Sequence, residues 1–118
     1  MELTYLASPY SSGGAGLLER QRRFEKVCKI AAALMRKGEN IFCPIAHSHP
    51  IEIYGMTTVE GHDFWLKQDF AVLAKCTKMV VVKMATWEQS VGIARELALA
   101  KHIGIPIAYV TEEEALDA

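Results

Sequence analysis

The chain has few of the features that mark secreted or membrane proteins. Its three cysteines, Cys28, Cys43 and Cys76, are widely spaced, form no C-x-x-C pair and are odd in number, which argues against a disulfide framework. No apolar run approaches the roughly 20 residues that span a bilayer, and no signal peptide is recognisable. We therefore expect a protein of the reducing cytoplasm with no membrane partner.

An excess of charge of either sign is also lacking. The 13 Lys and Arg residues nearly balance the 14 Asp and Glu residues, for a net charge of −1. Binding to a long nucleic acid normally needs a basic surface, so we expect none, although a few local basic groups would suffice for a small nucleotide. With 51% hydrophobic and 23% charged residues among its 118, the chain is expected to form one globular domain over residues 1–118.

Short apolar runs alternate with amphipathic segments along the chain. We expect strands at 3–7, 40–44, 78–83 and 105–110, and helices at 17–37, 62–75, 90–103 and 111–118. Segment 45–60 has weak periodicity and is predicted to be a loop with a mobile tip at 55–58. The run Lys78–Lys83 is continuously apolar between its ends, which is typical of a parallel sheet covered on both faces.

This alternation predicts a three-layer α/β fold with a flavodoxin-like or Rossmann-like parallel sheet of strand order 2-1-3-4. In such a sheet the ligand crevice lies at the switch point, here between the first and third strands. The glycine-rich loop 8–14 and the loop 85–92 follow these two strands and should meet there. The neighbourhood so predicted contains Tyr10, Ser11, Asp69, Trp87, Ser90 and Glu96.

Glu96 is the one acid in an otherwise apolar helix. Ser90 is a suitable N-cap for this helix, and Thr86 with Gln89 is an alternative start. At 3.6 residues per turn, Glu96 shares a face with the small residues Gly92 and Ala100, which leaves room for a ligand. The alternative is a solvated carboxylate paired with a nearby Lys or Arg.

Two further groups of polar residues suggest chemistry. Asp69 lies among apolar neighbours on its helix, so it is either buried against a partner or exposed at a site. His47, His49 and Glu52 could suggest a metal site, but no fourth ligand is evident, and we expect imidazoles that form hydrogen bonds in the crevice. Neither a metal nor another cofactor is expected. In the helix after the first loop, solvated positions are expected for Arg20 and Arg22, whereas the role of Arg23 stays open.

Several motifs carry a resemblance to a known superfamily. They are Tyr5-Leu6-Ala7-Ser8-Pro9-Tyr10, Arg23, Gly38, Asp69 with Leu73 and Cys76, and Ser90-Val91-Gly92 with Glu96 and Ala100. In these motifs, which cover most of the chain, the sequence resembles nucleoside 2-deoxyribosyltransferase-like proteins. This superfamily also includes deoxynucleotide N-glycosidases and small relatives of unknown function, to which the likeness is closest.

The resemblance implies roles for individual residues. Glu96 would be the nucleophile at C1′ of the sugar, Asp69 would assist the base or bind the sugar, and Tyr10 would orient the nucleophile or the sugar. The positions expected to bind the rest of the substrate are Ser8, Pro9, Ser11, Arg23, His47, Trp87, Ser90 and Gly92. Trp87 and the His47 segment are not shared with the well-studied enzymes of the superfamily.

Three functional classes follow. The leading one is an enzyme that cleaves or transfers the N-glycosidic bond of a nucleoside or nucleotide through a Glu96 intermediate. The alternatives are a nucleotide-binding module without turnover and a structural interaction domain in which Asp69 and Glu96 point to separate surfaces. The apolar side chains of Phe64, Trp65 and Phe70 also predict a homo-oligomer.

Overall fold

The computed structural model of the protein describes residues 1–56 and 61–117. Its elements in chain order are β1 (Thr4–Ala7), α1 (Leu17–Arg36), β2 (Ile41–Phe42), α2 (Pro44–Gly55), α3 (His62–Leu73), β3 (Lys78–Val82), the 3-10 turn η1 (Trp87–Gln89), α4 (Val91–Ile103), β4 (Ile107–Val110) and α5 (Glu112–Leu116). Within the described ranges, no helix combines the length and the apolar character that crossing a membrane requires.

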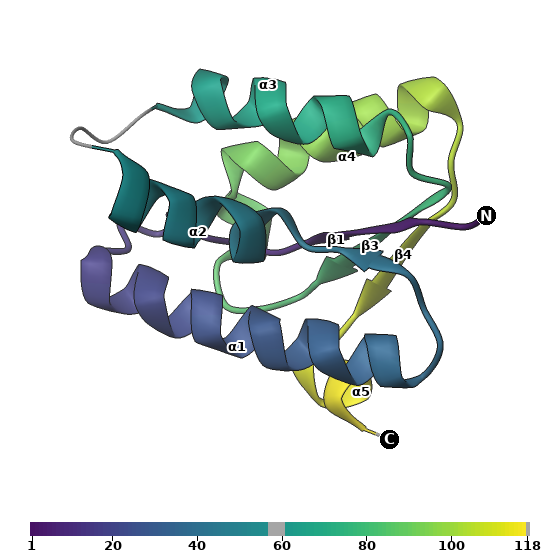
Figure 1. Cartoon of the computed structure of the whole chain (residues 1–118), viewed down its shortest axis with the longest axis horizontal. Coiled ribbons are helices and arrows are strands. Elements are labelled where there is room, and N and C mark those ends of the chain that lie inside the picture. The colour runs from purple at the N-terminus through teal and green to yellow at the C-terminus, as the bar shows by residue number, and fades with distance from the viewer. Residues whose placement is uncertain (57–60, 118) are drawn as a thin grey trace.

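The sheet has the predicted topology. Its strands are parallel and lie in the order β2-β1-β3-β4, so the predicted α/β fold class is confirmed. From β1 the chain first passes to one side, to β2, and later returns to β3 on the other side (Figure 1). The loops after β1 and β3 therefore leave the sheet next to each other at its carboxyl edge, as expected for a switch point.

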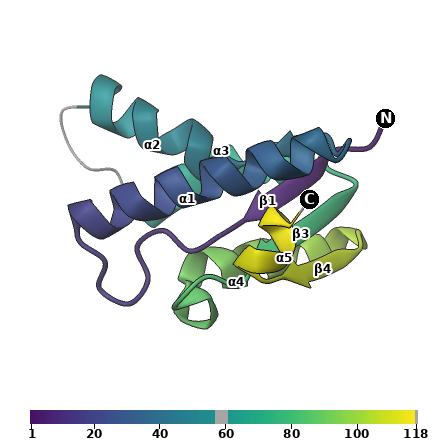
Figure 2. The same ribbon diagram turned by 90° about the horizontal axis from the view of Figure 1, so that it is seen from below.

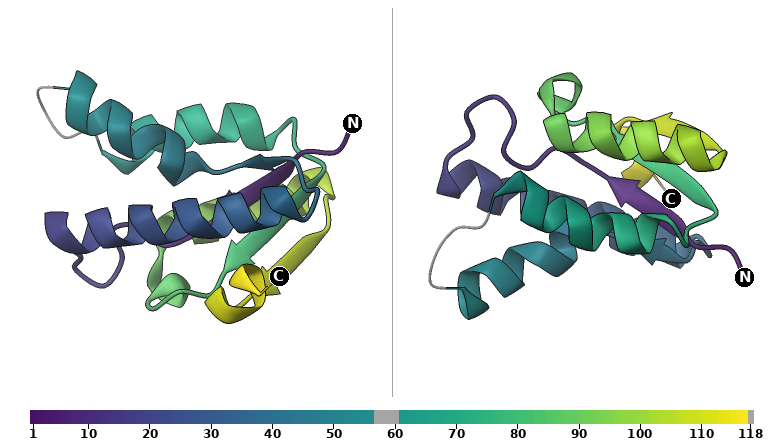
Figure 3. Two further views of the ribbon diagram at one scale, coloured as in Figure 1. Left: turned by 60° about the horizontal axis from the view of Figure 1, so that its bottom comes forward. Right: turned by 90° about the horizontal axis from the view of Figure 1, so that it is seen from above.

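Helices cover both faces of the sheet and create two apolar cores. Successive strand residues point to opposite faces: Leu6, Val80 and Val82 pack with α1 and α5, whereas Tyr5, Met79 and Val81 pack with α3 and α4. Figure 2 shows α1 and α5 on the near face, and the right-hand view of Figure 3 shows α3 and α4 on the other. Burial on both faces explains why the strands are apolar without alternation.

The helix that carries Glu96 begins and ends at residues with well-defined caps. The Ser90 hydroxyl accepts a hydrogen bond from the backbone N–H of Ile93 at 3.1 Å, which satisfies one of the free donors at the helix start. Gly104 closes the helix with a φ of 79°, a left-handed conformation that glycine adopts without steric cost. Thr86, the alternative start, instead precedes η1 with a φ of 69°.

The predicted loop over 45–60 is wrong for most of its length, because α2 spans Pro44–Gly55. Pro44 starts this helix at a position where its missing N–H costs nothing. The helical period was obscured because α2 buries the polar His49 while its apolar Ile53 and Tyr54 are exposed. Of the expected tip at 55–58, residues 57 and 58 lie outside the described part of the chain.

Candidate functional site

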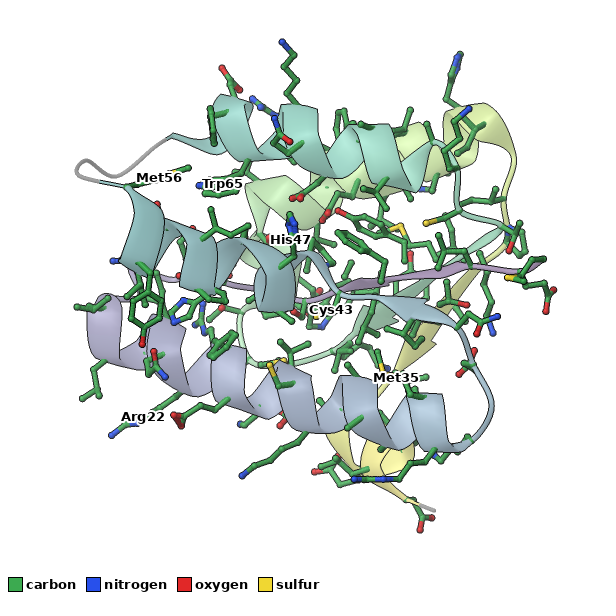
Figure 4. All side chains as sticks on the ribbon, in the orientation of Figure 1. Arg22, Met35, Cys43, His47, Met56 and Trp65 are labelled. Carbon is green, nitrogen blue, oxygen red and sulfur yellow. The ribbon has the colours of Figure 1, made fainter. Side chains whose placement is uncertain are left out.

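A cavity of about 310 Å³ lies at the carboxyl edge of the sheet, between the loop after β1, α2, α3 and the start of α4. It is the crevice that the strand order predicts. The expected site residues that line it are Ser8, Tyr10, Ser11, Asp69, Ser90, Gly92 and Glu96. Trp65 of α3 contributes to the wall facing α2 (Figure 4).

Glu96 is a buried member of this wall. Its side chain projects from α4, the residue is 6% exposed, and one carboxylate oxygen, Oε2, accepts a hydrogen bond from the Tyr5 hydroxyl. The alternative of a solvated carboxylate paired with a cation is therefore wrong. Burial raises the pKa of Glu96 to about 8; the hydrogen bond from Tyr5 opposes this rise, and the charge of Asp69 adds to it.

Asp69 faces the same cavity from α3. It is half-buried, and burial raises the pKa of its carboxyl group to about 6. Of the two possibilities that its apolar neighbours left open, the structure favours the acid at a site. Two carboxyl groups with raised pKa values on one cavity wall are a common feature of sites that move protons or bind charge.

Tyr5, which was not among the expected site residues, contacts Glu96 in place of Tyr10. Along β1, Tyr5 and Ala7 point toward α3 and α4. This direction brings the Tyr5 hydroxyl to Glu96, and burial raises the pKa of Tyr5 far above its usual value, so that it remains a donor. A tyrosine in an otherwise apolar buried strand was the available signal, because a buried hydroxyl needs a partner.

Tyr10 forms its hydrogen bond with a second residue that was not predicted in this role. Its hydroxyl lies 2.5 Å from Nδ1 of His49, whose Nε2 lies 2.7 Å from Oε1 of Gln21. His49 is 2% exposed and its ring stacks on Phe24 with 4.2 Å between ring centroids. Burial lowers the pKa of His49, so the ring is held neutral.

The structure gives no support to the metal site considered for the histidine motif. Both ring nitrogens of His49 are engaged, and His47 lies exposed near the Phe42 ring, outside the cavity (Figure 4). Among the residues that the structure describes, no group of three or more His, Cys, Asp or Glu side chains is arranged to hold a metal ion.

Four expected substrate-binding residues do not line the cavity: Pro9, Arg23, His47 and Trp87. Pro9 is fully buried under the loop. Trp87 packs against the core on the α4 side, with 5.7 Å between its ring centroid and that of Tyr109. The loops predicted to meet do meet, but Pro9, Arg23 and Trp87 pack into the protein and His47 is exposed outside the crevice.

Arg23 is the residue that joins the two loops. Its guanidinium donates to the carbonyl oxygens of Tyr10 and Ser12, both at 2.9 Å, and to the Thr86 hydroxyl at 3.1 Å. The Ser12 hydroxyl also lies 2.9 Å from that of Thr86. Arg23 is 8% exposed, so it acts on the cavity by holding the loop that carries Tyr10 and Ser11.

Arg20 lines the cavity, contrary to the expectation of a solvated side chain. Its guanidinium carbon lies 5.7 Å from the centroid of the Tyr10 ring, at the distance of a cation–π contact. Its Nε and the Oγ of the 7%-exposed Ser8 are buried without a hydrogen-bond partner in the described parts of the chain. Unpaired buried polar atoms are costly, and both of these residues line the cavity.

The contacts of Arg23 predict a large effect on stability. Replacing Arg23 with Met removes all three hydrogen bonds of the guanidinium and leaves the Tyr10 carbonyl oxygen without its donor, so we expect the free energy of unfolding to fall by about 2 to 4 kcal/mol. Arg22→Met, one position earlier on the exposed side of α1 (Figure 4), should change it by less than about 0.5 kcal/mol. Urea unfolding of both variants measures this; similar midpoints would contradict the role given to Arg23.

The family to which the chain belongs follows from a comparison of nearly its whole length. Residues 2–112 match the model of a domain of unknown function, DUF1937. The matched range contains both loops, the cavity and all the polar residues described above. No curated protein sequence matches the chain. The protein is a member of the DUF1937 family.

Proposed function

We propose that the protein cleaves or transfers the N-glycosidic bond of a nucleoside or nucleotide, with Glu96 as the nucleophile. The observation that carries the proposal is the buried Glu96 carboxyl group on the cavity wall, held at one oxygen by Tyr5 and facing the same cavity as Asp69. The resemblance to nucleoside 2-deoxyribosyltransferase-like proteins, in the motifs that contain these residues, supports it. We expect this chemistry in the cytoplasm.

The proposed reaction has two steps. A carboxylate oxygen of Glu96 bonds to C1′ while the bond from C1′ to the base nitrogen breaks, and the electron pair leaves with the base. Asp69 supplies the proton that the departing base needs, for which its raised pKa of about 6 is suitable. Water or an acceptor base then attacks C1′ and gives its proton to Asp69, while the bond from C1′ to Glu96 breaks; this releases the sugar or the new nucleoside and restores both carboxyl groups, as in retaining glycosidases.

Further polar atoms of the cavity wall favour a ligand with an anionic or hydroxyl group. Arg20 and Ser8 have buried atoms without partners in the described chain. Ser90 and Gly92 lie at the start of α4, where free backbone N–H groups and the helix dipole favour negative charge. A 5′-phosphate of a nucleotide or a 5′-hydroxyl of a nucleoside would satisfy these donors.

A nucleotide-binding module without turnover is the second candidate, and one observation favours it. With a pKa of about 8, Glu96 is mostly protonated near neutral pH in the unliganded cavity, and a protonated carboxyl group is a poor nucleophile. A substrate that develops positive charge at C1′ would favour the ionised form of Glu96. A ligand that is bound without reacting would not need Glu96 to be ionised.

Glu96→Gln separates the two candidates. The amide keeps the shape and can still form hydrogen bonds, so binding of a deoxynucleoside 5′-monophosphate should change less than about threefold. Base release should fall by at least about a thousandfold, because the covalent intermediate cannot form. Chromatography for the free base, with exposed Glu88→Gln as the control, measures this. Equal release by wild type and Glu96→Gln would remove Glu96 from the mechanism, and no release by either would favour the binding module.

The Tyr5 hydroxyl predicts the pH dependence of the reaction. Activity needs the Glu96 carboxylate and the protonated Asp69, whose pKa values of about 8 and about 6 lie in the opposite order, so kcat/KM should rise with pH to about 6, stay level, and fall above about 8. Tyr5→Phe removes the donor that stabilises the Glu96 anion, so the pKa of Glu96 rises further and the fall of kcat/KM above about 8 should move to higher pH by about one to two units. Exposed Tyr109→Phe is the matched control; an unshifted profile for Tyr5→Phe would show that Tyr5 does not act through Glu96.

Self-association is a further part of the proposal. Phe64 on α3 is 40% exposed, next to a Trp65 ring whose centroid lies 5.0 Å away, while Phe70 is half-buried against the core. Exposed aromatic side chains of this kind are common at contacts between subunits. Light scattering should give at least a dimer at micromolar concentrations, and Phe64→Ser should shift the equilibrium toward monomer. A monomer mass for the wild type at high micromolar concentration would refute this prediction.

A further inference from the structure

A continuous chain of hydrogen bonds runs from the surface of α1 to the cavity wall. Glu25, which is exposed, lies 3.2 Å through Oε2 from Nε2 of Gln21. Oε1 of Gln21 lies 2.7 Å from Nε2 of His49, and Nδ1 of His49 lies 2.5 Å from the Tyr10 hydroxyl. Of these four residues only Tyr10 lines the cavity.

The chemistry of Glu25 sets the direction of every hydrogen bond in this chain. A carboxylate only accepts, so the Gln21 amide turns its NH₂ group to Glu25 and its carbonyl oxygen to His49. That oxygen also only accepts, so the hydrogen of the neutral imidazole is on Nε2, and Nδ1 accepts. The Tyr10 hydroxyl is therefore the donor to His49.

The surroundings of His49 keep this arrangement in place. The ring is 2% exposed and is stacked on Phe24, so it has no room to turn over. Burial lowers the pKa of His49; of the charged groups around it, Glu52 on α2 opposes this shift and Arg20 on α1 adds to it. A neutral ring has one N–H only, which is directed to Gln21.

We propose that this chain makes Tyr10 a specificity-determining residue that can only accept a hydrogen bond from the ligand. Its single hydroxyl hydrogen is directed away from the cavity, to His49. A ligand group that meets the Tyr10 oxygen must then be a donor, such as a sugar hydroxyl or the amino group of a base, and a carbonyl there is disfavoured. The inference rests on the proposed function for the nature of the ligand, a nucleoside or nucleotide, but not on catalysis.

Glu25→Lys tests the proposal from outside the cavity. The ammonium can only donate, so the Gln21 amide should turn its oxygen to Lys and its NH₂ group to Nε2 of His49. The imidazole hydrogen then moves to Nδ1 and is donated to the Tyr10 oxygen, which frees the hydroxyl hydrogen for the cavity. Glu19→Lys, the same change of charge on α1 outside the hydrogen-bonded chain, is the matched control.

Two measurements read the direction of the chain. Nitrogen-15 NMR of the His49 side chain should show the hydrogen on Nε2 in the wild type and Glu19→Lys, and on Nδ1 in Glu25→Lys. Binding is measured for two pairs of nucleotides that differ by one donor group: 2′-deoxyadenosine 5′-monophosphate against purine 2′-deoxyriboside 5′-monophosphate, which lacks the amino group, and 2′-deoxyadenosine 5′-monophosphate against its 3′-O-methyl derivative. In at least one pair the wild type should prefer the donor about threefold to tenfold. Tyr10→Phe and Glu25→Lys should lose this preference, and Glu19→Lys should keep it.

The outcomes separate this inference from the proposed function. A hydrogen on Nδ1 of wild-type His49, a preference absent from both pairs, or a preference that persists in Tyr10→Phe would each overturn the inference. If the wild type shows the preference but releases no base, the inference about Tyr10 holds and the proposed enzymatic function fails. If none of these nucleotides binds, the ligand named here and the proposed function both fail, and the NMR result still decides the direction of the chain.

Discussion

The hydrogen bond between Tyr5 and Glu96 connects the first strand to the helix after the third, across the point where the strand order reverses. A carboxyl group that is 6% exposed needs a partner to offset the loss of water. The phenol of Tyr5 donates one hydrogen bond, to Oε2 of Glu96, and does not bind the other carboxylate oxygen, Oε1. Burial raises the pKa of Glu96 and this hydrogen bond opposes the rise, so Tyr5 favours the carboxylate form on which the proposed chemistry depends.

The loops around the cavity are held by the cation of Arg23, whose hydrogen bonds within the described part of the chain go to neutral acceptors. Arg23 donates to two carbonyl oxygens and a hydroxyl, so its charge is spread over neutral acceptors from both loops. These contacts join α1, the loop after β1 and the loop after β3. The position of Tyr10 in the cavity wall therefore depends on α1 and on Thr86 as well as on its own loop. The rigid fork of guanidinium donors is suited to this task, and a lysine could not reproduce it.

The buried histidine of α2 shows where reasoning from periodicity fails. A pattern of apolar residues predicted α1 and α4 well, because both bury apolar side chains such as Ile30 and Ile93. In α2 the buried face includes the polar residue His49. Its hydrogen bonds to Tyr10 and Gln21 satisfy the buried ring, so this position of the buried face carries no apolar side chain. Those partners come from two other segments, so no local pattern could have revealed that this histidine is buried.

The sequence by itself determined the order of the strands, the helices other than α2, the caps of α4 and the acids of the crevice. The elements and the caps depend on local features: apolar runs, a serine before a helix and a glycine after it. The strand order follows from the alternation of strands and helices through the rule of right-handed crossovers. Only the tertiary structure decided that Tyr5 rather than Tyr10 reaches Glu96, that Arg23 joins loops while Arg20 faces the cavity, and that His47 lies outside. The physical reason is that the direction of a side chain depends on the partners it meets, and these lie up to 91 positions away in the chain.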